Sequence, residues 1–184
     1  MKRYQFHLRK ITAQDLEKIL IWRNSPRIRY YMYNDHIIPM EEHNKWFEKI
    51  KNSKESIYLM FELNGKPMGL VNFNKINQET QTASWGFYVG EDKAPKGTGI
   101  TLGVLGLEYA FEKLNLKKLR GEAFAFNSAS INFHKKLGFV VEDRLEKHVL
   151  KNERYEDIIV FTMYRDKWIT NKENLKEYCL SEEK

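Results

Sequence analysis

Apolar positions near the N-terminus follow helical spacing in two segments, after a short first strand. Thr12 and Asp15 have the spacing of a capping box, and the apolar residues after them recur every three or four positions. Pro26 must end this helix or bend the chain. Pro39 opens a second helix, because a proline at the first helical position loses no hydrogen bond.

The rest of the chain reads as strands interrupted by two helices. An Asn64-Gly65 pair between two apolar runs is a strong hairpin-turn signal. An apolar helix begins at Ile100, and the tail from Asp166 predicts a loosely packed polar helix. Runs with strand character cover residues 57–63, 68–76, 83–89, 119–126, 139–149 and 155–164, with a further helix over 128–137. This order indicates an α/β (α+β) domain over residues 1–168, with a largely antiparallel sheet, and a polar tail over 169–184.

Composition supports one folded domain. The chain has 184 residues, of which 42% are hydrophobic and 14% aromatic, so it can bury a core. We find no apolar run long enough to cross a bilayer and no secretory signal pattern, so we expect no membrane contact. The single Cys179 cannot form an internal disulfide, which favours a reducing cytoplasm.

Charge and motif searches remove several classes of function. The formal net charge is +6, but the cations are interleaved with acids and no nucleic-acid-reading motif accompanies them. Gly97 and Gly99 would need a glycine at Leu102 to form a dinucleotide fingerprint, and no P-loop is present. The five histidines lack metal-ligand spacing, so we expect no metal.

Two runs in the second half carry the strongest chemical signal. The loop 94–99, Ala-Pro-Lys-Gly-Thr-Gly, stands directly before the helix at Ile100. Its backbone N–H groups lie beside the positive end of the helix dipole, where a phosphate can bind. The run 127–139 reads Asn-Ser-Ala-Ser-Ile-Asn-Phe-His-Lys-Lys-Leu-Gly-Phe. Taken alone, the loop is equally an ordinary helix entry and Asn127 an ordinary helix cap.

In this order and at this spacing, the two runs resemble the GCN5-related N-acetyltransferases (GNAT). The resemblance extends from about Tyr4 to Trp168. It implies a twisted, mostly antiparallel sheet of about seven strands with about four helices. It also implies a V-shaped splay between the fourth and fifth strands. One departure is Ala94, where the family usually has Arg or Gln.

The resemblance implies acetyl-CoA as the co-substrate. Its pyrophosphate would rest on the loop and the helix start, and its pantetheine arm would lie along the strand at 85–89. The implied cofactor-binding residues are Phe87, Tyr88, Val89, Lys96, Gly97, Thr98, Gly99, Ile100, Thr101, Asn127, Phe133 and Lys136.

Two residues are candidates for proton transfer during direct attack of an amine on the thioester. Glu122 would take the amine's proton. Alternatively, Glu122 is a strand residue that faces the solvent and has no part in the reaction. His134 stands where the family usually has a tyrosine that protonates the departing thiolate, and an imidazole can do this work. Alternatively, His134 is a partly exposed helix residue without a role in the reaction.

The N-terminal part gathers aromatic residues and cations for an acceptor. Arg23 and Lys75 suit a pyrophosphate, and Met32 and Tyr33 suit a flat base. The pattern resembles nucleotide-amino-sugar N-acetyltransferases of the pseudaminic acid pathway, which serves flagellin glycosylation. The candidate substrate-binding residues are Arg23, Met32, Tyr33, His43, Asn74, Lys75 and Tyr88.

Several alternatives stay open at this point. A similar Trp-Arg-Asn start occurs in acetyltransferases of ribosomal-protein N-termini, so the acceptor could instead be such an N-terminus or another small amine. Arg23 with Asn24 could also simply end a helix. Outside enzymes, the alternatives are a coenzyme A-binding or nucleic-acid-binding module. The expected partner is a small nucleotide-sugar molecule, and a homodimer is possible.

Overall fold

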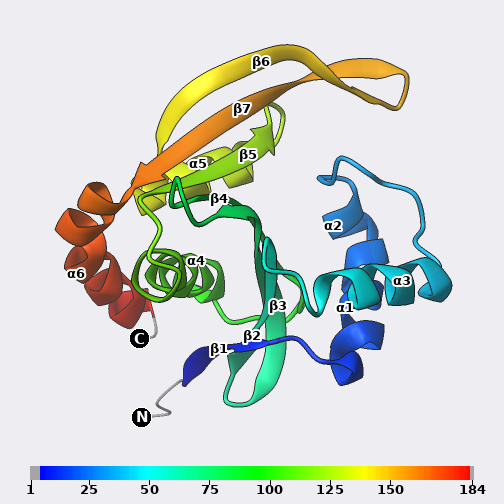
Figure 1. The fold of residues 1–184 in the computed structure, drawn as a ribbon, viewed down its shortest axis with the longest axis horizontal. Coiled ribbons are helices and arrows are strands. Elements are labelled where there is room, and N and C mark those ends of the chain that lie inside the picture. The colour runs from blue at the N-terminus through cyan, green and yellow to red at the C-terminus, as the bar shows by residue number, and fades with distance from the viewer. Residues whose placement is uncertain (1–4, 183–184) are drawn as a thin grey trace.

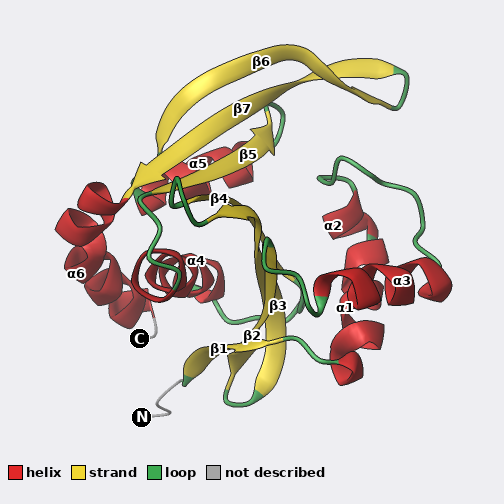
Figure 2. Ribbon diagram, in the orientation of Figure 1, coloured by secondary structure: helices red, strands yellow, loops and turns green. Residues whose placement is uncertain are grey.

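A seven-stranded sheet forms the centre of the molecule, which a computed structural model describes for residues 5–182 (Figures 1 and 2). The order across the sheet is β1-β2-β3-β4-β5-β7-β6. All neighbours are antiparallel except β4 and β5, which are parallel. The strands are β1 (Phe6–Lys10), β2 (Ser56–Leu63), β3 (Lys66–Asn77), β4 (Thr82–Val89), β5 (Lys118–Phe124), β6 (Val140–Lys151) and β7 (Arg154–Tyr164). The predicted fold class is therefore confirmed; Tyr4 and the last two tail residues lie outside the described residues.

Six α-helices flank the sheet in the described part of the chain, against about four predicted. They are α1 (Leu16–Asn24), α2 (Pro26–Arg29), α3 (Met40–Ile50), α4 (Thr98–Glu108), α5 (Ser128–Leu137) and α6 (Arg165–Glu182). The first extra helix is α2, a single turn that Pro26 begins directly after α1. The other is α6, which is not the loosely packed helix that its polar sequence predicts. Trp168 and Cys179 anchor it, since both are buried in the main core.

The alternation of side chains along the strands sorts the helices into two layers. On β2 and β3, Met60 and Leu70 pack with Ile19, Trp22 and Ile28 of α1 and α2. The intervening positions, such as Val71, face the opposite way and join the core around α4. Figure 1 shows this arrangement, with α1, α2 and α3 on one side of β2–β4 and α4 on the other.

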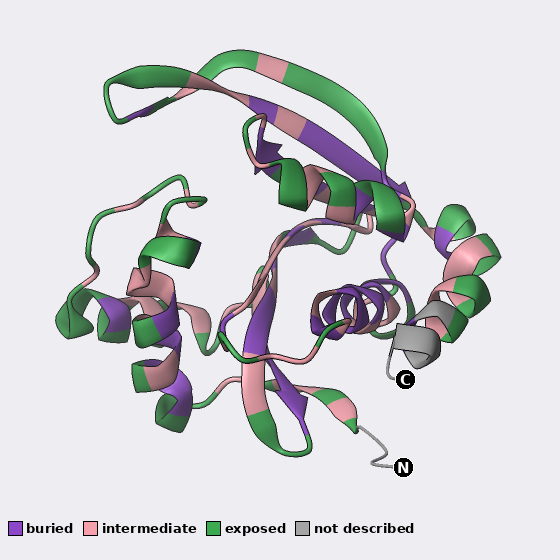
Figure 3. Ribbon diagram, turned by 180° about the vertical axis from the view of Figure 1, so that it is seen from behind, coloured by how far each residue is buried: buried purple, intermediate pink, exposed green. Residues whose placement is uncertain are grey.

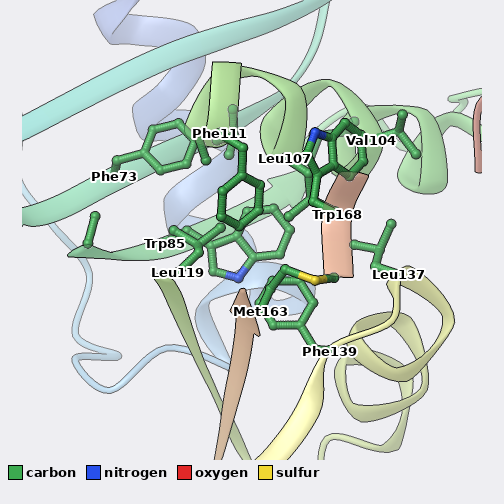
Figure 4. Close-up of a cluster of buried hydrophobic side chains, with 14 of the residues drawn as sticks. Phe73, Trp85, Val104, Leu107, Phe111, Leu119, Leu137, Phe139, Met163 and Trp168 are labelled. Atoms are coloured by element: carbon green, nitrogen blue, oxygen red, sulfur yellow. The ribbon is translucent and has the colours of Figure 1, made fainter. Parts of the chain in front are cut away.

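The main core surrounds α4, which is apolar on almost every side. Figure 3 shows this helix as mostly buried ribbon, and Figure 4 shows the side chains packed about it. Leu102 and Leu107 are fully buried on α4, as are Leu119 on β5 and Leu137 on α5. A helix without a polar face must be covered on all sides. Its N-terminus is thereby held rigidly beside β4.

β6 forms one outer edge of the sheet and is exposed along most of its length (Figure 3). Its pairing with β7 shifts register twice, between Val141 and Asp143 and between Leu145 and Val149. The β6–β7 turn uses Asn152 and Glu153 with positive φ, as expected for a tight hairpin. In residues 5–182, none of the helices is long and apolar enough to cross a membrane.

Candidate active site

The parallel strands β4 and β5 separate after three residue pairs. Thr82, Ala83 and Ser84 pair with Lys118, Leu119 and Arg120, and no further pairs follow. Beyond Ser84, the edge of β4 that faces β5 has no strand partner in the described residues. A cleft of about 700 Å³ opens at this splay, between β4, the start of α4, α5 and the helices α1 to α3. The predicted V-shaped gap is confirmed.

One wall of the cleft is the N-terminus of α4. Gly97 caps this helix with φ +86°, a left-handed conformation that favours glycine. Gly99 borders the cleft, and a Cβ built on it would approach only Val89 Cγ2 at 3.9 Å and Phe133 Cε2 at 4.0 Å. The first N–H groups of an α-helix lack partners within the helix. This wall can therefore receive a phosphate through its backbone.

The side chains of three other predicted residues here, Thr98, Ile100 and Thr101, are buried within the protein. Thr98 and Thr101 are buried, and their hydroxyl groups donate to the carbonyl oxygens of Pro95 (2.7 Å) and Gly97 (3.3 Å). The side chain of Ile100 belongs to the core. Lys96 is exposed beside the loop, and Lys136 is exposed on α5.

Aromatic rings and the start of α5 line the middle of the cleft. Phe87 on β4 and Phe133 on α5 lie with ring centroids 4.4 Å apart. Tyr88 and Val89 also line the cleft. Asn127 caps α5, because its Oδ1 accepts from the backbone N–H of Ser130 at 3.0 Å. Its side-chain NH₂ group is a donor at the cleft wall, so capping and ligand binding are compatible.

His134 lies among aromatic rings and is only 1% exposed. Its ring stacks on Phe161 with centroids 4.4 Å apart. Nδ1 donates to the carbonyl oxygen of Ser130 at 2.8 Å, and Nε2 accepts from Trp85 Nε1 at 3.2 Å. Burial lowers the pKa of His134 to about 4, so the ring is neutral at pH 7. These are the contacts of a structural histidine; the acid role stays a prediction, and this geometry weighs against it.

Glu122 extends from β5 into the cleft, as predicted for a residue beside the splay. Both of its oxygens have partners. Arg120 Nη2 lies 2.8 Å from Oε1, and the Tyr33 hydroxyl donates to Oε2 at 2.5 Å. The carboxylate is therefore held in one orientation at the rim of the cleft. Burial, and then the bond to Glu122, raise the pKa of Tyr33, so this phenol keeps its proton.

The acceptor side of the cleft contains four of the predicted residues. Arg23, Met32, His43 and Tyr88 all line it. His43 is buried; its Nε2 donates to the carbonyl oxygen of Leu16 at 3.0 Å, and burial lowers its pKa. Its part in the wall is therefore a neutral ring stacked on Trp46, with centroids 4.9 Å apart.

Three predicted substrate residues, Tyr33, Asn74 and Lys75, do not line the cleft. Tyr33 is connected to it only through its hydrogen bond to Glu122. The pairing of β3 with β4 is interrupted between Asn74 and Asn77, and Lys75 has φ +53° and is exposed. Asn72 lies at the cleft instead. Alternation could have found it, because Asn72 shares a strand face with Leu70, while Val71 and Phe73 face the core.

Other lining residues were missed because distant segments bring them together. Arg27 of α2 donates to the carbonyl oxygens of Val89 (3.1 Å) and Gly90 (2.8 Å). Trp46 and Tyr58 meet edge to face at 5.0 Å on the acceptor wall. No sequence motif marks these residues.

In residues 5–182, no cluster of three His, Cys, Asp or Glu side chains could hold a metal ion.

The fold and the cleft define an acetyl-CoA-dependent N-acetyltransferase. The bare helix start, the side-chain-free face at Gly99 and the open edge of β4 fit the pyrophosphate and the pantetheine arm of acetyl-CoA. The chain belongs to the GNAT family, because the family model described as an acetyltransferase (GNAT) domain matches residues 8–160.

The relatives that are similar to this chain include two acetyltransferases with different names. Acetyltransferase PseH of Campylobacter jejuni is 26% identical over 134 residues, which cover 73% of this chain and 82% of that protein. Spermidine N(1)-acetyltransferase of Vibrio cholerae is 25% identical over 170 residues, covering 92% and 98%. A crystal structure of the V. cholerae spermidine N-acetyltransferase in complex with CoA and spermine has a TM-score of 0.85 at 25% identity. It covers 90% of this chain and 98% of that one.

Proposed function

We propose that the chain acetylates the free amine of a nucleotide-linked amino-dideoxy sugar, a UDP-4-amino sugar of the pseudaminic acid or a related nonulosonic acid pathway. The observation that carries this proposal is Arg23 on the acceptor wall. Its Nη2 donates to the carbonyl oxygen of Asn34 at 2.5 Å. Its Nη1 is buried, and within residues 5–182 no acceptor is in hydrogen-bonding reach of it. Burial lowers the pKa of Arg23, a sign that its charge is poorly solvated.

A diphosphate is the acceptor group that suits this arginine. A buried donor without an acceptor costs free energy, and phosphate oxygens accept from a guanidinium in pairs. The wall beside it holds Trp46, Tyr58 and Met32, which offer flat or adaptable apolar surface for a base. One end of the cleft thus supports phosphate recognition and base stacking together.

Polyamines are the second candidate, because Glu42 and Glu122 also line the cleft and a spermidine acetyltransferase is a relative. Both carboxylates have partners, however. His36 Nε2 lies 2.9 Å from Glu42, and Arg120 lies 2.8 Å from Glu122. Arg23 would in addition repel a polycation. The charges therefore favour the nucleotide sugar.

The residues at the splay suit direct transfer to an amine. Acetyl-CoA supplies the activated acetyl group when it is bound. The backbone N–H of Phe87 or of Tyr88, whichever points to the unpaired edge of β4, can stabilise a developing oxyanion. Glu122, fixed by Arg120 and Tyr33, is placed to accept the proton that the attacking amine must lose. We expect the reaction to take place in the cytoplasm, since the single cysteine offers no disulfide framework.

An acceptor screen tests this proposal. Purified protein is given acetyl-CoA with a UDP-4-amino-4,6-dideoxy sugar, with spermidine, or with ribosomal-protein N-terminal peptides. We expect turnover of the UDP-amino sugar, and we expect Arg23→Gln to raise its KM about tenfold or more while the KM of acetyl-CoA changes little. Arg154→Gln, a change at the exposed first residue of β7, is the control.

If spermidine or the peptides are acetylated and no UDP-amino sugar is, the proposed acceptor is wrong, and the compound that reacts is the acceptor. The N-acetyltransferase assignment does not depend on that choice.

A further inference from the structure

A lysine in the β6–β7 hairpin is buried against the loop that borders the acceptor cleft. Lys151 is the last residue of β6, and its side chain is only 3% exposed. Its Nζ lies 2.6 Å from Asp35 Oδ2 and 3.0 Å from the carbonyl oxygen of Met32. The same Nζ lies 5.6 Å from the Phe124 ring centroid and 6.0 Å from that of Tyr30. Figure 1 shows the hairpin turn on the same side of the molecule as α2.

A buried ammonium is costly unless close partners compensate for its lost hydration. All the oxygen partners of Lys151 come from the loop between α2 and α3. The hydrogen bond from Lys151 also holds the pKa of Asp35 below its usual range. The hairpin turn and this loop are therefore held together, although more than a hundred residues separate them in sequence.

The same loop positions the acceptor side of the cleft. Met32 lines the cleft, and the Tyr33 hydroxyl donates to Glu122. The carbonyl oxygen of Asn34 accepts from Arg23. Residues 32–35 thus connect Lys151 with the two charged groups on which the acceptor site depends.

The acetyl-CoA wall lies apart from this connection. It is built from the start of α4 together with Val89 and Phe133, and none of the contacts of Lys151 involves them. A change at Lys151 should therefore weaken the binding of the acceptor more than the binding of acetyl-CoA.

We infer that Lys151 is a positioning residue for the acceptor: with Asp35 it latches the loop at 30–38 over the cleft and thereby sets acceptor affinity. The identity of that acceptor rests on the proposed function, but the latch itself does not. Lys151 touches neither substrate and acts through Met32, Tyr33 and Asn34.

The test compares Lys151→Met, Asp35→Asn and the double variant with Arg154→Met. Arg154 pairs with Lys151 across the hairpin and is exposed, so it is a matched control. For the acceptor that the screen identifies, each single change should raise KM about tenfold, while the KM of acetyl-CoA stays within about twofold. The value of kcat should also fall, because Tyr33 orients Glu122. The double variant should be no worse than either single one. Lys151→Arg should recover most of the affinity.

Hydrogen exchange provides a readout that needs no acceptor. Amides in residues 30–38 should exchange about tenfold faster in both single variants, while those of α4 and β4 stay unchanged. If Lys151→Met fails to fold, Asp35→Asn carries the test, because the Asp35 side chain is 38% exposed and an asparagine oxygen can still accept a hydrogen bond from Lys151.

Unchanged exchange in residues 30–38, or equal losses for acceptor and acetyl-CoA, would overturn the latch. If the screen finds no UDP-amino sugar turnover, the proposed acceptor fails, and the exchange result still decides the latch.

Discussion

At the scale of single residues, His134 is a titratable group that the fold keeps neutral. Its pKa is about 4 in the folded chain, against ~6.5 in an unfolded one, so the unfolded chain binds the proton more tightly. Its contribution to stability is therefore full above pH 6.5 and is lost as the pH falls from 6.5 toward 4.

We predict that lowering the pH from 7 to 5 costs the protein about 2 kcal/mol of unfolding free energy through His134. Urea unfolding at the two pH values measures this. His134→Phe should show a correspondingly smaller loss. The remainder includes His43, whose pKa is lowered in the same direction, and the paired carboxylates whose pKa values are also lowered. Equal losses in the parent and the variant would show that His134 does not titrate as its burial requires.

The sequence identified the position of His134 but not its environment. The position came from the run 127–139, whose pattern is local. The ring of His134 is kept neutral by its burial against Trp85 of β4 and Phe161 of β7, which are distant in sequence. Gly121 also makes room for it, since a Cβ there would lie 2.5 Å from Nε2. Such a crowded site leaves little space for the larger tyrosine that the resemblance would place there.

At the scale of elements, the start of α4 is the feature whose function follows most directly from its sequence. We predict that Gly99→Val weakens acetyl-CoA binding by about tenfold or more, because the branched side chain would occupy the wall on which the pyrophosphate rests. Isothermal titration with coenzyme A measures the affinity.

The fold of this variant should survive, since a Cβ at position 99 meets nothing closer than 3.9 Å. Gly99→Ala should lose less affinity than the valine variant. An unchanged affinity for Gly99→Val would remove the pyrophosphate from this wall.

Most elements could be predicted because their signals are local. Pro39, the Asn64-Gly65 turn and the glycines before α4 mark boundaries that the structure confirms to within a few residues. The acceptor wall could be predicted only in part. Asn74 pairs with Ser84, where β4 is still joined to β5, so it lies outside the splay. Lys75 lies in the interruption of the β3–β4 pairing and is exposed. Lys151 gave no sequence signal, because its partners lie far away in the chain.

At the scale of the whole molecule, the net charge of +6 is spread over the chain, and the cleft itself includes Arg23 and Arg27 together with Glu42 and Glu122. Such a field concentrates anionic substrates near the cleft, and salt screens it. We predict that the KM of a nucleotide-sugar acceptor rises several-fold when salt is increased from about 0.05 to 0.5 M. Steady-state kinetics across the salt series measures this rise.

The rise should be smaller for Arg23→Gln than for the parent, because one of the charges that attract the acceptor is gone. An acceptor KM that falls with salt would indicate a cationic acceptor and would favour the polyamine.

The exposed edge at β6 has a consequence for how the protein behaves at high concentration. A free edge of twelve residues offers backbone groups on which a strand of another molecule could add and start aggregation. Half of its residues are charged: Glu142, Asp143, Arg144, Glu146, Lys147 and Lys151. Its two register shifts also break the flat ladder that an incoming strand would need. The β6–β7 hairpin can therefore be long enough to contact the loop at 30–38 without making the protein prone to form fibres.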